Sequence, residues 1–192
     1  MPVAIDLAGA LAIQARANRL ANHRLHGAMA ALPLAGLQAP RVGFFPSLMA
    51  TLNHILGVDQ YYVGSLLGEP GLAAAWAAFV PAADLAALRQ RQALSDERLT
   101  TFCDALDAAG CAREVQMARG GGRIQRDLVA HVLAHLFMHQ THHRGQLHAM
   151  LSGTAVAPPQ LDEFLMPSEA HLRQAEMAAL GWDEAVVYGG RR

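Results

Sequence analysis

Lysine is absent from this 192-residue chain, so every basic side chain other than histidine is an arginine. Acidic and basic residues nearly balance at a formal net charge of -1, and no arginine-rich stripe stands out. A protein that binds nucleic acid needs a basic surface that neutralises phosphates. The charge pattern therefore argues against DNA or RNA as a partner.

Cysteine is scarce, with Cys103 and Cys111 as the two thiols of the chain. Zinc ribbons need repeated close pairs of cysteines, and disulfide-stabilised small domains are far richer in cysteine. Neither pattern is present in this sequence. We expect both cysteines to be buried or inert thiols, rather than a disulfide or a catalytic nucleophile.

Long apolar runs are also missing, although 53% of the residues are hydrophobic. A membrane-spanning helix needs about 20 consecutive apolar residues, and no stretch of the chain reaches that length. The first residues, MPVAIDLAGALAIQARANRL, lack the basic start, apolar run and small-residue cleavage site of a secretory signal. We therefore expect a cytoplasmic protein with no membrane partner.

Aromatic residues make up only 6% of the chain and β-branched residues are sparse, whereas alanine and leucine dominate. This composition favours helices over strands. Apolar positions at three- and four-residue spacing, interrupted by proline and glycine, predict the helical segments. The four long helices are expected over Ile5–Leu32, Ser47–Gly68, Asp84–Ala109 and Gln125–Leu151, with Ser47 as the cap of the second.

Four long amphipathic helices in a chain of one-domain length, residues 1–192, predict an all-α four-helix bundle with long crossover connections. Short extra helices are expected over residues 71–79 and in the segment HLRQAEMAALG. The segment CAREVQMARGGGRIQ has no helical period, so it is predicted to be an irregular or briefly extended crossover. Bundles of this kind build metal sites from side chains that face inward on different helices.

Histidine, by contrast, is clustered, because five of the ten histidines lie within residues 135–148. Residues four apart lie on nearly the same face of a helix. At roughly 100° per residue, His143 lies about 40° and His139 about 80° from the centre of the apolar face. His135 and His142 lie about 120° and about 140° from it, toward solvent or a partner subunit. The inward pair is therefore predicted to be His139 and His143.

A third ligand must come from elsewhere, because zinc and similar ions take at least three protein ligands, with an open position in catalytic sites. His54, in ATLNHILGV, is the best candidate, since it lies inside a long predicted helix among apolar residues. His23 and His26 are the alternatives. A shared ion would satisfy buried imidazoles that are costly to leave unpaired. We expect a divalent metal, with zinc first, and nickel or iron also suited to imidazole ligands.

Four further polar residues are candidates to support the metal ligands. Asn18, Asn22 and Gln146 can each orient a histidine ring through a hydrogen bond, although amides at helix contacts are often simply paired with each other. Asp59 lies about 140° around its helix from the third histidine, so it cannot reach the same ion. We expect Asp59 to pair with Arg144 or to form hydrogen bonds within the bundle.

Several segments together resemble the DinB (YfiT-like) family over nearly the whole chain. They are RANRLANHRL, the FFPS lead-in, PSLMATLNHILGVDQ, and His135 and His139 followed by THHRGQ, in the order that the family has them. Leu20 stands where many relatives have a tryptophan, a difference that affects packing more than metal binding. The resemblance implies a four-helix bundle, usually a homodimer, with a divalent metal on His54, His139 and His143.

The resemblance also implies a class of activity. Characterised relatives are often metal-dependent transferases that activate a low-molecular-weight thiol such as bacillithiol or mycothiol, and related bundles isomerise maleylpyruvate or act in ergothioneine synthesis. It does not imply DNA repair or a polymerase. We expect a small thiol and an electrophilic small molecule as partners. The alternatives are a hydrolase that uses metal-bound hydroxide and a non-catalytic bundle that binds a metal or ligand.

Overall fold

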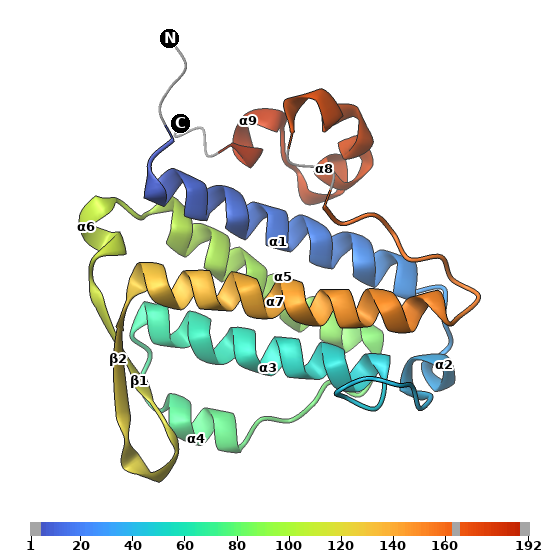
Figure 1. The fold of residues 1–192 in the computed structure, drawn as a ribbon, viewed down its shortest axis with the longest axis horizontal. Helices are drawn as coiled ribbons and strands as arrows, with labels where there is room; N and C mark the ends of the chain where they lie inside the picture. The colour runs from blue at the N-terminus through green and yellow to red at the C-terminus, as the bar shows by residue number, and fades with distance from the viewer. Residues whose placement is uncertain (1–4, 163–165, 189–192) are drawn as a thin grey trace.

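The computed structural model of the protein describes residues 5–162 and 166–188. Four long helices lie side by side and form a bundle, which confirms the predicted all-α class (Figure 1). They are α1 (Leu7–Met29), α3 (Leu48–Leu67), α5 (Leu85–Asp104) and α7 (Val129–Ser152). Their contacts close a ring, because α1 packs against α5 and α7, and α3 packs against the same two helices.

Side-chain caps begin three of the four long helices. Asp6, Ser47 and Asp84 each accept a hydrogen bond from the backbone N–H three residues later, at 2.8, 3.1 and 2.8 Å. A cap of this kind stabilises a helix by about 1 kcal/mol. Ser47 is therefore the cap that the sequence predicts, and Gly68 ends α3 in the left-handed conformation at φ 73°.

The predicted helix over Gln125–Leu151 is wrong at its start, because α7 begins at Val129. The residues before it form strand β2 (Ile124–Leu128), which pairs antiparallel with β1 (Glu114–Ala118). Backbone groups that pair across this hairpin are not available for helical hydrogen bonds. The run of glycines turns the chain between the strands, and Gly121 has a φ of 71° that favours glycine.

The predicted third helix over Asp84–Ala109 is wrong at its end, because α5 stops at Asp104. A separate short helix, α6 (Ala108–Cys111), follows it. Asp107 caps α6 by accepting a hydrogen bond from the N–H of Gly110 at 2.7 Å. A new N-cap inside the predicted helix therefore redirects the chain before it enters the hairpin.

The remaining elements of the described chain are short. They are α2 (Leu34–Gln38), α4 (Leu72–Ala77), η1 (Gly120–Gly122), η2 (Pro167–Leu172), α8 (Gln174–Leu180) and α9 (Glu184–Val187). Helix α4 contacts α3, and α8 and α9 contact α1. Among the described helices, none has the length and apolar character needed to cross a membrane. The single-domain prediction for residues 1–192 includes positions outside the described residues, and it stays a prediction.

A layer of buried polar side chains separates two hydrophobic clusters in the bundle. On α3 one cluster ends at Leu56 and the other begins at Val58, and on α7 the boundary falls between Phe137 and Leu147. The buried polar side chains near these boundaries come from all four long helices: Asn18, Asn22, Asp59, Gln92, Asp96, Gln140, His143 and Arg144. We call this set the polar layer. His143, a predicted metal ligand, therefore lies between the two apolar clusters.

Candidate metal site

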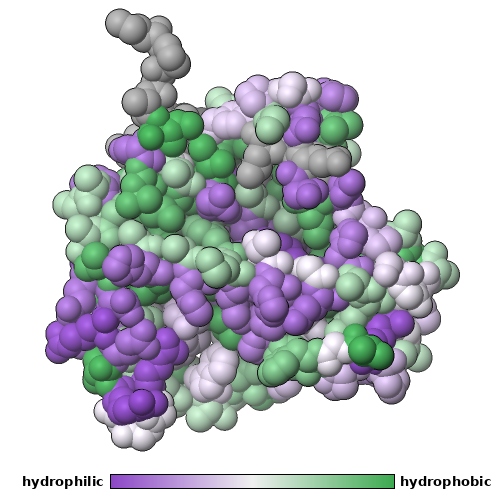
Figure 2. Space-filling view, in the orientation of Figure 1, coloured by the Kyte–Doolittle hydropathy of each residue, from purple (hydrophilic) through white to green (hydrophobic). Residues whose placement is uncertain are grey.

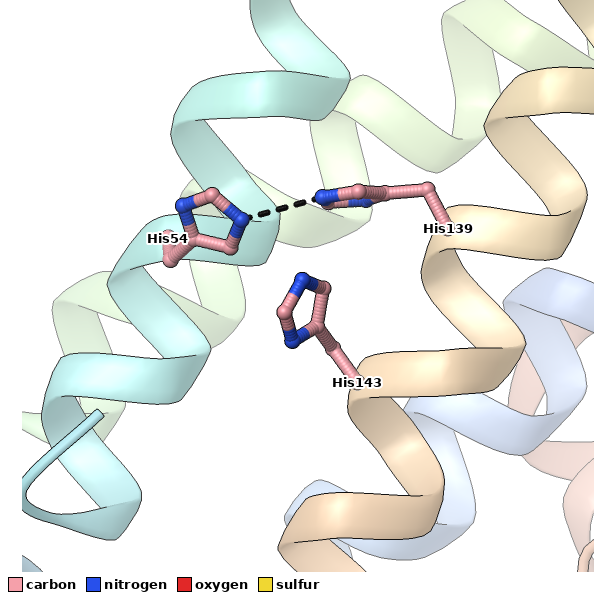
Figure 3. A group of neighbouring side chains, drawn as sticks. All are labelled: His54, His139 and His143. Carbon is pink, nitrogen blue, oxygen red and sulfur yellow. Dashed lines mark hydrogen bonds between the residues drawn. The ribbon is translucent and has the colours of Figure 1, made fainter. Parts of the chain in front are cut away.

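Three histidines converge between α3 and α7. His54 comes from α3, whereas His139 and His143 lie one turn apart on α7 (Figure 3). Each ring offers a nitrogen, and these three atoms all lie within 4.8 Å of one another. The Nε2 atoms of His54 and His139 are 3.0 Å apart. We call these residues the His triad.

The exposures on α7 follow the predicted angular order. His143 is buried and His139 is half-buried, whereas His135 and His142 are exposed. Figure 2 shows hydrophilic side chains over the face of α7 that is turned to the viewer. The alternatives on α1 do not join the triad: among the described residues, the group that can hold a metal contains neither His23 nor His26.

The geometry of the His triad fits a divalent ion. Zinc binds imidazole nitrogen at about 2.0–2.1 Å in tetrahedral geometry, which places neighbouring ligand atoms about 3.3 Å apart. The observed Nε2–Nε2 separation of His54 and His139, 3.0 Å, is close to that value. No cysteine or carboxylate of the described residues joins the group, so a bound ion would keep an open position.

Burial favours the neutral rings that bind metals. The pKa of His54 is lowered to about 4, mainly by burial, with His143 adding to the shift. Burial likewise lowers the pKa of His139 to about 4, with the neighbouring histidines adding to the effect. The pKa of His143 is lowered by burial, while its hydrogen bond to Gln146 opposes the shift. All three rings are therefore in the ligand form at neutral pH.

Gln146 is the predicted supporting residue that contacts the His triad. Nδ1 of His143 donates to Oε1 of Gln146 at 2.8 Å, and Nε2 of Gln146 donates to Nε2 of His142 at 3.1 Å. With its proton on Nδ1, His143 presents a free lone pair on Nε2. The Nδ1 of His139 is buried without a hydrogen-bond partner among the described residues, and its Nε2 lies 3.0 Å from Nε2 of His54.

Asn18 and Asn22 lie in the polar layer, and their hydrogen bonds agree with the alternative that these amides are paired with other polar groups. Their side-chain amides donate to Oδ1 of Asp96, at 3.2 and 3.1 Å. Their carbonyl oxygens accept hydrogen bonds from Nη1 of Arg144. These asparagines therefore link a buried carboxylate to a buried guanidinium. The sequence does not reveal Asp96 as their partner, because that depends on how α1 and α5 are rotated.

Asp59 is also part of the polar layer, and among the described residues no hydrogen bond joins it to the His triad. Its Oδ2 accepts a hydrogen bond from Nε2 of Gln92 at 2.7 Å, in agreement with the expected role within the bundle. Its pKa is raised to about 7, mainly by burial, with the nearby carboxylate of Asp96 adding to the shift. Arg144 acts on Asp59 through its charge, and no ion pair within 4.0 Å joins them among the described residues.

Two cavities meet at His54. The aromatic cavity, of about 510 Å³, is lined by residues that include His54, His139, Tyr61, Tyr62, Trp76 and Arg119. The second cavity, of about 600 Å³, is lined by residues that include His54, Asn53, Trp76, Phe79 and Pro81. Both volumes lie within the range of ligand pockets, ~300–1,000 Å³. The sequence reasoning missed the aromatic walls, although Tyr61 and Tyr62 lie on α3, the same helix as His54.

Phe45 packs on another side of the His triad. Its ring centroid is 4.3 Å from that of His54 and 5.6 Å from that of His143. Phe45 belongs to the segment that leads into α3, just before the Ser47 cap. An aromatic ring in this place displaces water and fixes the orientation of two imidazoles by contact.

The DinB family model matches residues 13–177, from the first half of α1 to α8. The matched part contains all three residues of the His triad and the whole of α3, α5 and α7. A comparison with curated proteins finds no match. Because this match covers most of the chain, the chain belongs to the DinB family.

Proposed function

We propose that the protein is a divalent-metal-dependent transferase that joins a low-molecular-weight thiol to an electrophilic carbon. One observation carries this proposal: three neutral imidazoles converge where two cavities meet, and no fourth protein ligand joins them among the described residues. Zinc is the first candidate, and nickel and iron also suit imidazole ligands. An open position is typical of catalytic rather than structural sites.

A divalent ion held by His54, His139 and His143 would stabilise the anionic form of a thiol at neutral pH. In the transfer, a sulfur–carbon bond forms, the thiol proton passes to solvent, and the leaving group departs with its electron pair. The chain itself supplies three things. Burial keeps the histidine rings neutral, Gln146 holds the proton of His143 on Nδ1, and Phe45 shields the rings from water.

The protein's own cysteines are poorly placed to act as the nucleophile. Cys103 and Cys111 are both buried, and neither lines the aromatic cavity or the second cavity. Burial raises the pKa of Cys103 to about 12, and it also raises the pKa of Cys111. A reactive thiolate needs a lowered pKa and access to the substrate. These properties support an external thiol.

The two cavities favour a reaction between two organic molecules. His54 and Trp76 line both cavities, so molecules bound in them would meet at the His triad. A hydrolase needs room for one organic substrate and water, so the second cavity would have no occupant in that alternative. The pair of cavities therefore supports transfer over hydrolysis.

The test combines metal analysis with a two-substrate assay. Untagged protein is analysed for metal, then mixed with glutathione, cysteine, bacillithiol or mycothiol and an activated aryl chloride. Turnover should need both a thiol and the metal, and it should be lost in His54→Ala and His143→Ala. His131→Ala, an exposed histidine outside the triad, is the matched control.

Each other outcome points elsewhere. Ester hydrolysis without thiol would replace the transferase proposal by a hydrolase. Tight metal binding with neither activity would favour a binding protein. Equal metal content in the wild-type protein and both triad variants would contradict the proposed metal site.

A further inference from the structure

The aromatic cavity contains a cation that the proposed transfer does not use. Arg119 follows β1 and lines the same cavity as His54 and His139. Figure 1 shows the hairpin beside α3 and α4, and α3 contacts β1. The crossover that the sequence predicts to be irregular or briefly extended forms strand β1 and places a guanidinium near the His triad.

Neutral groups hold the Arg119 side chain in place. Its Nε donates to Oε1 of Gln125 at 2.9 Å, and its Nη2 donates to the hydroxyl of Tyr62 at 3.1 Å. The guanidinium carbon lies 5.4 Å from the ring centroids of both Tyr61 and Tyr62. These two hydrogen bonds use two of the five guanidinium N–H groups, so three are left for a ligand.

No carboxylate neutralises Arg119 within 4.0 Å in the described part of the chain. The same hairpin shows the contrast, since Arg126 forms an ion pair with Glu114 at 2.8 Å. The carboxylate of Asp127 acts on Arg119 through its charge, and it accepts a hydrogen bond at 2.7 Å from Nε2 of Gln125, the side chain whose Oε1 accepts from Arg119. Arg119 is thus a half-buried cation that could bind an anion, and the described chain does not supply one.

The cavity walls indicate the chemical character of the rest of the ligand. Tyr61 packs edge-on against Tyr62 and Trp76, with ring centroids 5.4 and 5.6 Å apart. Trp76 itself is 47% exposed, which is unusual for a large aromatic ring without a ligand or partner to cover it. Flat apolar groups stack favourably on such rings. The pocket therefore combines an aromatic wall with one cationic end.

We propose that the aromatic cavity binds a small carboxylic acid with a flat apolar body. The carboxylate accepts hydrogen bonds from Arg119, whose planar fork matches it, and the body lies against Tyr61 and Trp76. This inference extends the proposed function, because such a molecule would be the electrophilic substrate with its reacting carbon toward the His triad. Binding of the acid itself does not depend on the metal.

Calorimetric titration tests the inference with 3-phenylpropionate and its neutral amide as probes. The wild-type protein should bind the acid at least about tenfold more tightly than the amide, because a charge-assisted pair is lost in the amide. Arg119→Gln should abolish this preference, and Arg119→Lys should restore part of it. Arg123→Gln is the matched control, since Arg123 is an exposed residue of the same hairpin that does not line the cavity. Trp76→Ala should weaken both probes equally.

Repeating the titration after chelation separates this inference from the proposed function. Acid binding that needs Arg119 but survives chelation supports the anion site, even if the protein shows no thiol chemistry. Acid binding that disappears on chelation and ignores Arg119→Gln would mean that the carboxylate binds the ion, which would overturn the inference. So would failure of the acid to bind the wild-type protein. Circular dichroism and thermal unfolding of Arg119→Gln exclude misfolding as the cause of a loss.

Discussion

Nδ1 of His143 donates a hydrogen bond to Oε1 of Gln146, 2.8 Å away on the next turn of α7. This bond leaves Nε2 of His143 free to bind an ion. Among the described residues, His143 is the one member of the His triad whose second ring nitrogen is hydrogen bonded. Gln146 therefore fixes the orientation of a ring that could bind a metal ion.

Replacing Gln146 should weaken metal binding. Loss of such a partner typically costs 10–100-fold in affinity, so we expect a loss of that order for Gln146→Leu. Gln146→Glu keeps an acceptor for the Nδ1 proton and should retain most of the affinity. Competition against a chromophoric chelator measures both values. Equal affinities for Gln146→Leu and the wild-type protein would show that packing alone orients His143.

Metal removal should destabilise the wild-type protein and leave His54→Ala almost unaffected. An ion that binds only the folded state stabilises it by about 2.7 kcal/mol when its free concentration is 100 times Kd. The variant lacks the α3 ligand, so it cannot gain this stabilisation. Thermal unfolding with and without a chelator measures the difference. A similar drop in Tm for both proteins would place the stabilising metal outside the His triad.

The polar layer should make stability depend on pH through Asp59. Burial raises its pKa in the folded protein to about 7, above the ~3.9 expected in the unfolded chain. The folded state therefore binds the proton more tightly than the unfolded chain does. The resulting contribution to the free energy of unfolding is complete below about pH 4 and is lost as the pH rises through 7. Gln92, Asp96, Gln140 and Arg144 are the groups that act on this carboxyl.

Asp59→Asn removes the titration, so its free energy of unfolding should fall less than that of the wild-type protein between pH 5 and 8. Urea unfolding at several pH values provides the measurement. Glu97→Gln, at an exposed acid on α5, is the control and should keep the wild-type slope. Parallel curves for Asp59→Asn and the wild-type protein would contradict the assignment.

The sequence reveals the His triad because the relevant information is periodic. On a regular helix, angle from the apolar face predicts burial, and His143, His139 and His135 are buried, half-buried and exposed in that order. His54 follows from its apolar neighbours on α3. These arguments need only the rotation of each helix toward the core, which the positions of apolar residues determine.

Arg119 and Trp76 could not be placed in this way. Arg119 lies in the turn of a two-stranded hairpin and Trp76 on the six-residue helix α4, and neither segment is long enough for its periodicity to define a face. Their contacts with Tyr61 depend on where the crossover passes over α3. The partners of Asn18 and Asn22 were also missed, because they depend on how α1 and α5 are rotated relative to each other.

His26 should lower the stability of the protein at acid pH, whereas Asp59 lowers it as the pH rises. It is buried on α1, and burial lowers its pKa to about 3, with the charge of Arg89 adding to the shift. The unfolded chain binds the proton near pH 6.5. The stabilising contribution of the neutral ring is therefore complete above that pH and is lost as the pH falls toward 3.

His26→Leu should flatten the acid limb of the stability curve, because leucine cannot take up the proton that the unfolded histidine binds. Urea unfolding of chelated protein between pH 7 and 4.5 measures the slope, and the His triad contributes equally to every protein compared. His171→Leu, at an exposed histidine of η2, should keep the wild-type slope. If His26→Leu loses stability with acid as steeply as the wild-type protein does, the ring must already be protonated in the fold, in conflict with its burial.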